Sequence, residues 1–143
     1  MRLIQPDDYI RDVLTEAKTI ALIGASDKED RPSHRVMKFL QSRGYRVIPV
    51  NPRLAGKELL GERVYGDVRE IEEEVDMIDI FRKPEDVPSV ALAAMSHFKT
   101  LKSIWMQLGI TSFSAAEVAR AKGLKVVQDR CPAIEIPRLL GDA

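Results

Sequence analysis

The sequence predicts an α/β fold in which helices cover both faces of a doubly wound, mostly parallel sheet of five or six strands. Short apolar runs alternate with segments of helical periodicity along the whole chain, which is typical of this class. The first apolar run, residues 20–23, is unbroken, as expected of a strand buried on both faces. The 143 residues contain no repeat and no linker, so a single domain over residues 1–143 is expected.

The N-terminal third is expected to form a helix followed by a βαβ unit. Residues 6–18 carry apolar side chains along one side of a helix, and residues 33–43 repeat them at the same spacing. The strands of the unit are residues 19–23 and 46–50, and a crossover of this kind is right-handed in nearly all proteins. Gly44 follows the second helix at the position where a glycine commonly ends one.

The middle of the chain is rich in turns, and regular alternation then resumes. Glycines mark turns between residues 54 and 66, with a short edge strand expected at residues 63–65 and a brief helix, capped by Asp67, at residues 67–74. From there the apolar pattern predicts strands at residues 76–81, 102–106 and 125–128, and helices at residues 84–97, 112–122 and 133–140.

Composition excludes several classes of protein. The 22 basic and 22 acidic residues cancel, so the overall charge predicts neither a nucleic-acid partner nor an anionic membrane. No apolar run approaches the roughly 20 residues of a membrane span, and no signal-peptide pattern is visible. Cys131 is the single cysteine, which argues against a disulfide framework and a cysteine-based metal site and favours a reducing cytoplasm. We therefore expect a cytoplasmic protein without a metal.

The loop after the first strand is the first candidate binding site, because ligands of doubly wound sheets lie beyond the carboxyl ends of the strands. Small residues 24–26 end the strand, and a polar loop leads to a helix start, where free N–H groups and the helix dipole favour phosphate. Lys28, Arg31 and His34 add positive charge and Ser33 a hydroxyl. The dinucleotide fingerprint with three glycines is absent, and a solvated loop of mixed charge is the alternative.

The loop after the second strand carries Asn51, Pro52 and Arg53. Sheets that bind NAD usually place a carboxylate here to accept hydrogen bonds from the ribose hydroxyls. An amide and a nearby guanidinium instead favour an additional phosphate on the ribose, as in NADP or in the 3′-phosphate of coenzyme A. The alternative is a surface arginine that follows a proline turn.

The loop at residues 81–87 combines an aromatic residue, two cations and a helix start. Phe81 or Val87 could form a wall for adenine, and Arg82 could contact a phosphate. A core phenylalanine and a solvated basic pair explain the same residues equally well.

Seven short segments recur in the order in which they occur in one known family. They are IGAS at residues 23–26, RPS at 31–33, GY at 44–45, PVNP at 49–52, DIFR at 79–82, WMQLG at 105–109 and DRC at 129–131. Over about residues 10–140 the chain thereby resembles the stand-alone CoA-binding proteins of prokaryotes, which are relatives of the N-terminal domain of succinyl-CoA synthetase alpha chains.

This resemblance implies a Rossmann-like fold with coenzyme A lying across the strand ends. It places residues 24–26 and 31–34 near the phosphates, Arg53 at a phosphate, and residues 81, 82 and 87 around the adenine. The expected cofactor-binding residues are Gly24, Ala25, Ser26, Arg31, Ser33, His34, Asn51, Pro52, Arg53, Phe81, Arg82 and Val87. The synthetases also have a second domain with a phosphorylated histidine, for which this chain is too short.

The leading hypothesis is therefore a protein that binds coenzyme A or an acyl-CoA without a complete active site of its own. No Ser-His-Asp arrangement and no paired carboxylates occur in the candidate loops, so no catalytic residue is predicted. One alternative is an NADP-binding redox enzyme or sensor, for which Arg53 is equally suited. Another is a CoA-binding subunit of a larger acyl-CoA ligase, and a homo-oligomer or a partner subunit stays open.

Cys131 follows the last expected strand by three residues and adjoins Arg130. If that strand is parallel to the others, the thiol comes near the rim of the ligand site, and the cation could lower its pKa. A mixed disulfide with coenzyme A is one prediction, and an inert buried cysteine is the alternative.

Overall fold

A computed structural model describes residues 3–141 of the chain. It has five parallel strands in the order β2-β1-β5-β6-β7, which confirms the predicted doubly wound sheet. The strands are β1 (Thr19–Ile23), β2 (Arg46–Val50), β5 (Met77–Ile80), β6 (Ser103–Met106) and β7 (Lys125–Val127). The order reverses between β1 and β5, so the carboxyl ends of these strands and of β2 meet at one edge.

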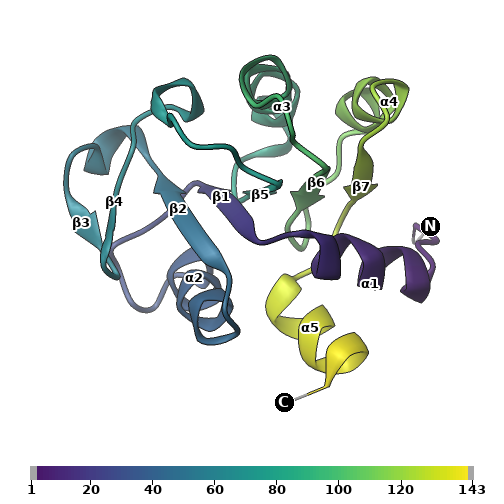
Figure 1. Cartoon of the computed structure of the whole chain (residues 1–143), viewed down its shortest axis with the longest axis horizontal. Coiled ribbons are helices and arrows are strands. Elements are labelled where there is room, and N and C mark those ends of the chain that lie inside the picture. Colours follow the sequence, from purple (N-terminus) through teal and green to yellow (C-terminus); the bar gives the residue numbers. More distant parts are fainter. Residues whose placement is uncertain (1–2, 142–143) are drawn as a thin grey trace.

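Helices cover both faces of the sheet, as the alternation predicted (Figure 1). The helices α3 (Val87–His97) and α4 (Phe113–Ala121) lie on one face. The helices α1 (Asp7–Glu16), α2 (Pro32–Ser42) and α5 (Pro132–Leu140) lie on the other. No helix within residues 3–141 has the length and apolar character needed to cross a membrane.

The two faces of the sheet are packed as two separate apolar clusters. Alternate residues of a strand point to opposite faces, so Ile78 and Ile80 of β5 join the cluster under α3 and α4. Met77 of the same strand joins the cluster under α1, α2 and α5, together with Leu22 of β1 and Trp105 of β6. Asp79, the one polar residue of β5, therefore points into the cluster under α2 and α5.

Short elements fill the turn-rich middle of the chain and differ from the expectation. The edge strand expected at residues 63–65 does not join the sheet: β3 (Glu58–Leu59) and β4 (Glu62–Arg63) form a separate hairpin, and only Tyr65 bridges to Val50. The three-residue 3-10 helices η1 (Pro52–Leu54) and η2 (Val68–Glu70) lie in this part, and η3 (Pro84–Asp86) lies between β5 and α3.

The helix expected at residues 67–74 is wrong, because only the single turn η2 forms there. Asp67 does cap it, since its Oδ1 accepts a hydrogen bond of 2.9 Å from the Arg69 N–H. Ile71 is then fully buried in the core, and Glu74 accepts two bonds from Thr100, which draws the chain out of helical geometry. The helix expected at residues 84–97 also divides, since Pro88 lacks an N–H and is accommodated only in the first turn of α3.

The first helix also closes one open edge of the sheet. β7 lies at the end of the strand order and so presents unpaired backbone groups. The Val126 N–H donates to the Tyr9 Oη at 2.7 Å, and the Gln5 amide both donates to and accepts from the Gln128 backbone at 2.7 Å. At the same N-terminal end of α1, Asp7 pairs with Arg138 of α5 at 2.9 Å. The two terminal helices therefore complete the same face.

Candidate functional site

Two hollows lie at the carboxyl edge of β1, β2 and β5, one on each side of the strand ends. The α2-side hollow has a volume of about 460 Å³ and is formed by the β1–α2 loop, the β2 end and Phe81. The α3-side hollow has a volume of about 210 Å³ and lies between the β1 and β2 ends, η2 and α3. This edge is where the topology predicts a ligand.

The turn after β1 depends on Gly24. Its φ is +93°, and a Cβ placed there would lie 2.4 Å from the Phe81 carbonyl oxygen. The N–H groups of Gly24 and Ala25 both donate to the Val50 carbonyl, at 2.9 and 3.1 Å. These two N–H groups hold the loop against β2 and are not directed at a ligand.

Asn51 fixes the two loops relative to one another. Its Nδ2 donates to the Ala25 carbonyl at 2.7 Å, and its Oδ1 accepts from the Arg53 N–H at 2.9 Å. The residue that replaces the usual carboxylate is thus engaged through both ends of its amide. It orients the first loop and the backbone of Arg53 together.

The N-terminus of α2 forms the far wall of the α2-side hollow. Arg31 is the N-cap residue without a side-chain cap, and Pro32 follows as the first helical residue. The backbone N–H groups of His34 and Arg35 both bond to the Arg31 carbonyl. The His34 ring is buried, and its Nδ1 lies 2.9 Å from the Ser26 carbonyl oxygen. His34 therefore ties the loop to α2 from behind and does not line the hollow.

The α2-side hollow carries an excess of positive charge. Lys28, Arg31 and Arg53 line it, against a single carboxylate, Asp27. The N-terminal end of α2 adds the partial positive charge of its dipole at the same wall. Such a concentration of exposed cations and dipole at one hollow is suited to a ligand with several negative charges.

The α3-side hollow is mainly apolar. Its apolar lining consists of Ile23, Val50, Pro52, Val68, Val90 and Ala93. Its two arginines are already paired: Arg69 with Asp67 at 2.7 Å, and Arg82 with Asp86 at 3.0 Å. The hydrogen bond from Arg69 lowers the pKa of Asp67 to about 2. An apolar hollow bordered by paired charges can hold a flat, neutral ring system.

Ten of the twelve residues expected at the site line one of these hollows. Those at the α2-side hollow are Gly24, Ala25, Ser26, Arg31, Ser33, Asn51, Arg53 and Phe81. Pro52 and Arg82 line the α3-side hollow, whereas His34 and Val87 line neither. Val87 is fully buried in the core under α3. Sequence reasoning missed Asp67 and Arg69, because nothing in residues 67–69 indicates that η2 folds back over the strand ends.

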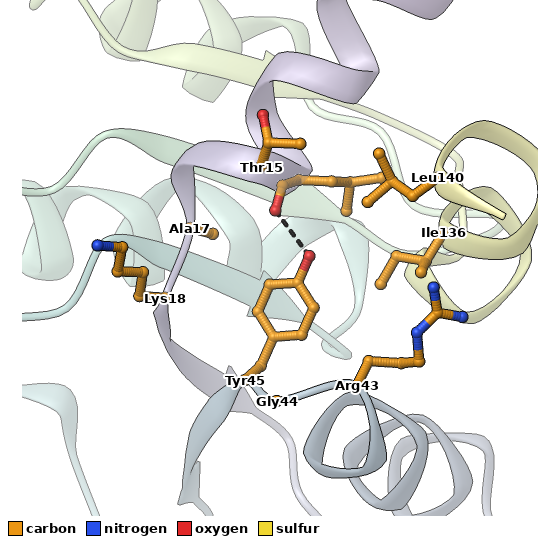
Figure 2. Close-up of a pocket in the computed structure, with 9 residues that line it drawn as sticks. Thr15, Ala17, Lys18, Arg43, Gly44, Tyr45, Ile136 and Leu140 are labelled. Carbon is orange, nitrogen blue, oxygen red and sulfur yellow. Dashed lines mark hydrogen bonds between the residues drawn. The ribbon is translucent and has the colours of Figure 1, made fainter. Parts of the chain in front are cut away.

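A third hollow, of about 470 Å³, lies at the opposite edge of the sheet (Figure 2). Arg43 and Tyr45 border it, with the Tyr45 hydroxyl donating to the Leu14 carbonyl at 2.6 Å. The carboxyl ends of α1, α2 and α5 converge there, and these ends carry partial negative charge. Although Lys18 and Arg43 line this hollow, it lies away from the carboxyl ends of the strands, where ligands of doubly wound sheets bind, and we therefore assign the candidate site to the carboxyl edge.

Cys131 does not reach either strand-end hollow. β7 is parallel to β6, so its carboxyl end lies at the same edge of the sheet as the two hollows, as expected. Cys131 nevertheless precedes α5 as its N-cap residue, and its side chain is buried in the cluster that contains Trp105. Within residues 3–141, no group of three or more His, Cys, Asp or Glu side chains could hold a metal ion.

Burial predicts that the Cys131 thiol is slow to react. Because thiol–disulfide exchange requires access to sulfur, we expect an aromatic disulfide reagent to modify the folded protein at least about 100-fold more slowly than the urea-unfolded protein. Absorbance of the released thiolate measures both rates. Equal rates would show that Cys131 is accessible and would support the mixed disulfide with coenzyme A.

The parallel, doubly wound sheet with helices on both faces defines an α/β domain of the Rossmann-like class. The chain belongs to the CoA binding domain family, whose model matches residues 18–137. This confirms the family inferred from the seven short segments.

Similarity to individual proteins agrees with this family. The chain is 35% identical over 122 residues to the Bacillus subtilis protein YneT, covering 85% of this chain and 87% of YneT. A solved structure of a hypothetical protein from Pyrococcus horikoshii superposes with a TM-score of 0.87 at 37% identity, covering 99% of this chain and all of that one. An ADP-forming acetate–CoA ligase from Methanocaldococcus jannaschii is 30% identical over 83 residues, which span 58% of this chain but only 12% of the ligase.

Proposed function

We propose that this protein binds coenzyme A or an acyl-CoA at the carboxyl edge of the sheet, with the phosphates in the α2-side hollow and the adenine in the α3-side hollow. The observation that carries the proposal is the group of three cations, Lys28, Arg31 and Arg53, around one hollow at the start of α2. Asn51 stands at the position where an NAD site carries a carboxylate. Because its amide is neutral, it does not offset the positive charge of Arg53 at the β2 end.

The two hollows match the two halves of the nucleotide. The diphosphate and the 3′-phosphate carry the negative charge, and three cations with the α2 dipole offset it. Adenine is flat and neutral, and the apolar lining of the α3-side hollow, from Ile23 to Ala93, offers it contact area. In this proposal the protein has no complete active site of its own and lies in a reducing cytoplasm.

Arg53 is proposed to contact the 3′-phosphate. We expect 3′-dephospho-CoA to bind about 1.5–3 kcal/mol more weakly than CoA, because a charge-assisted hydrogen bond is lost. In Arg53→Met this difference should largely disappear, since CoA then loses affinity while dephospho-CoA does not. Titration calorimetry measures both ligands on both proteins. Arg120→Met on α4 is the matched control and should behave as the wild type.

An NADP site is the alternative that the same calorimetry tests. The 2′-phosphate of NADP calls for the same guanidinium at the β2 end. Tight binding of NADP with no measurable binding of CoA would overturn the proposal.

A subunit of a larger ligase is the second alternative, favoured by the 30% identity to a segment of the acetate–CoA ligase. This alternative requires a second polypeptide that carries out the nucleotide chemistry of the ligase. Purification from native extract as a single polypeptide that binds CoA supports the stand-alone binding protein. Stable co-purification with a nucleotide-binding chain supports the subunit.

A further inference from the structure

Three buried side-chain oxygen atoms below the strand ends have no hydrogen-bond partner within residues 3–141. They are the two carboxyl oxygens of Asp79 and the Oε1 of Gln107. Asp79 is fully buried and Gln107 is 7% exposed. A buried acceptor left without a donor costs about 1–3 kcal/mol, so folded proteins rarely keep three of them close together unless a ligand or water completes them.

The sheet register places both side chains on the same face. Asp79 of β5 lies opposite Trp105 of β6, and Gln107 lies two residues beyond Trp105 along the same chain. Because side chains alternate along a strand, Asp79, Trp105 and Gln107 all point toward α2 and α5. The Gln107 N–H donates to the Ile80 carbonyl at 3.3 Å, so the ladder continues as far as Gln107.

Phe81 separates these acceptors from the α2-side hollow. It lies two residues beyond Asp79, in line with Gln107 on the neighbouring strand, and it lines the hollow. It also packs against the apolar cluster of that face. Gln107 is therefore the next polar side chain beyond Phe81 in the direction from the hollow toward β6. Asp79 lies two residues earlier on β5, deeper in the sheet than both.

We propose that Gln107 and Asp79 form an inner subsite for the pantetheine arm of a CoA ligand, whose amide groups complete the buried acceptors. This inference rests on the proposed function. An arm that leaves the α2-side hollow past Phe81 meets Gln107 first. A secondary amide offers one N–H and one C=O, which complement a carboxamide and a neutral carboxyl alike.

The ligand group must be neutral. Of the side chains around Asp79, Leu22 and Trp105 are its register neighbours, and the Trp105 Nε1 is already donating to the Arg130 carbonyl at 2.8 Å. Burial raises the pKa of Asp79 to about 8, and no cation offsets it. The subsite at neutral pH thus has hydrogen-bonding capacity without charge, which suits an amide and not a phosphate.

The test compares two ligands that share the nucleotide but not the arm, namely CoA and adenosine 3′,5′-bisphosphate. By calorimetry at pH 6.5, Gln107→Leu should bind CoA about tenfold more weakly than the wild type, while the bisphosphate changes less than about twofold. Asp79→Asn keeps a neutral donor and acceptor and should bind CoA within about threefold of the wild type, whereas Asp79→Leu should lose about tenfold.

Gln41→Leu is the matched control, because Gln41 lies at the far end of α2 and donates to the Leu60 carbonyl. It should leave both ligands unaffected. Circular dichroism checks that each variant is folded, and removal of an unpaired acceptor in Gln107→Leu should not lower its melting temperature.

The outcomes separate the two proposals. If Gln107→Leu leaves the affinity for CoA unchanged, or weakens both ligands equally, the subsite is wrong and the CoA site stands. Unchanged affinity then assigns the buried acceptors to trapped water. If the wild type binds neither ligand, the proposed function fails and the subsite fails with it.

Discussion

Gly24→Ala is expected to lower the free energy of unfolding by about 2–5 kcal/mol. The new Cβ would lie 2.4 Å from the Phe81 carbonyl oxygen and 3.0 Å from its carbon, both of them backbone atoms that no side-chain rotation can move. The φ of +93° adds the cost of a left-handed conformation. Relief of the clash would require β1 and β5 to separate at the point where the two strand-end hollows meet. Affinity for CoA should therefore fall together with stability.

Gly44→Ala separates these two causes. Gly44 has a nearly identical φ of +91°, but a Cβ there meets nothing within 4 Å. The Gly44→Ala substitution should lower the free energy of unfolding by only about 1–2 kcal/mol, because only the backbone conformation is unfavourable. Urea denaturation measures both variants. Equal losses would mean that the approach to Phe81 contributes nothing, and that Gly24 is required only for its turn.

Asp79→Asn is expected to remove most of the pH dependence of stability between pH 5 and 8. Burial raises the pKa of Asp79 from 3.8 to about 8, so the folded protein keeps a proton that the unfolded chain releases near pH 4. A raised carboxyl pKa means that stability is greatest at low pH and is lost as the pH rises toward 8. The wild type should thus lose about 4 kcal/mol at most between pH 5 and 8.

Asparagine cannot ionise, so this variant should equal the wild type near pH 4 and exceed its stability at pH 8. Urea denaturation at four pH values gives both curves. Asp12→Asn, an exposed carboxyl of α1, is the control and should follow the wild type. Parallel curves for Asp79→Asn and the wild type would contradict the prediction, and would mean that water or a neighbouring donor already stabilises the Asp79 carboxylate.

The sheet could be predicted from the sequence because its strands are short, apolar and regularly spaced. The β1–α2–β2 unit was predicted almost to the residue, since apolar runs define both strands and Gly44 follows the end of α2, which begins at Pro32, one residue before the predicted start. The helix predicted at residues 67–74 failed because two tertiary contacts, burial of Ile71 and the bond from Thr100 to Glu74, override local propensity.

The sequence predicted which loops form the candidate site better than it predicted which side chains point into it. Topology selects the strand ends, and most of the polar residues there line a hollow. Whether a residue faces the ligand or the core depends on packing that the sequence does not display. Val87 and His34 turn inward for this reason, and Asp67 and Arg69 arrive from a segment without a motif.

The contacts of α1 with β7 also affect how the chain avoids self-association. An uncovered parallel edge strand is a template onto which another molecule can add a strand. The Tyr9 hydroxyl and the Gln5 amide occupy the outward-facing groups of Val126 and Gln128, and so make that template unavailable. During synthesis the covering segment leaves the ribosome before the strand that it covers. The segment that covers the β7 edge is therefore already synthesised when that edge forms.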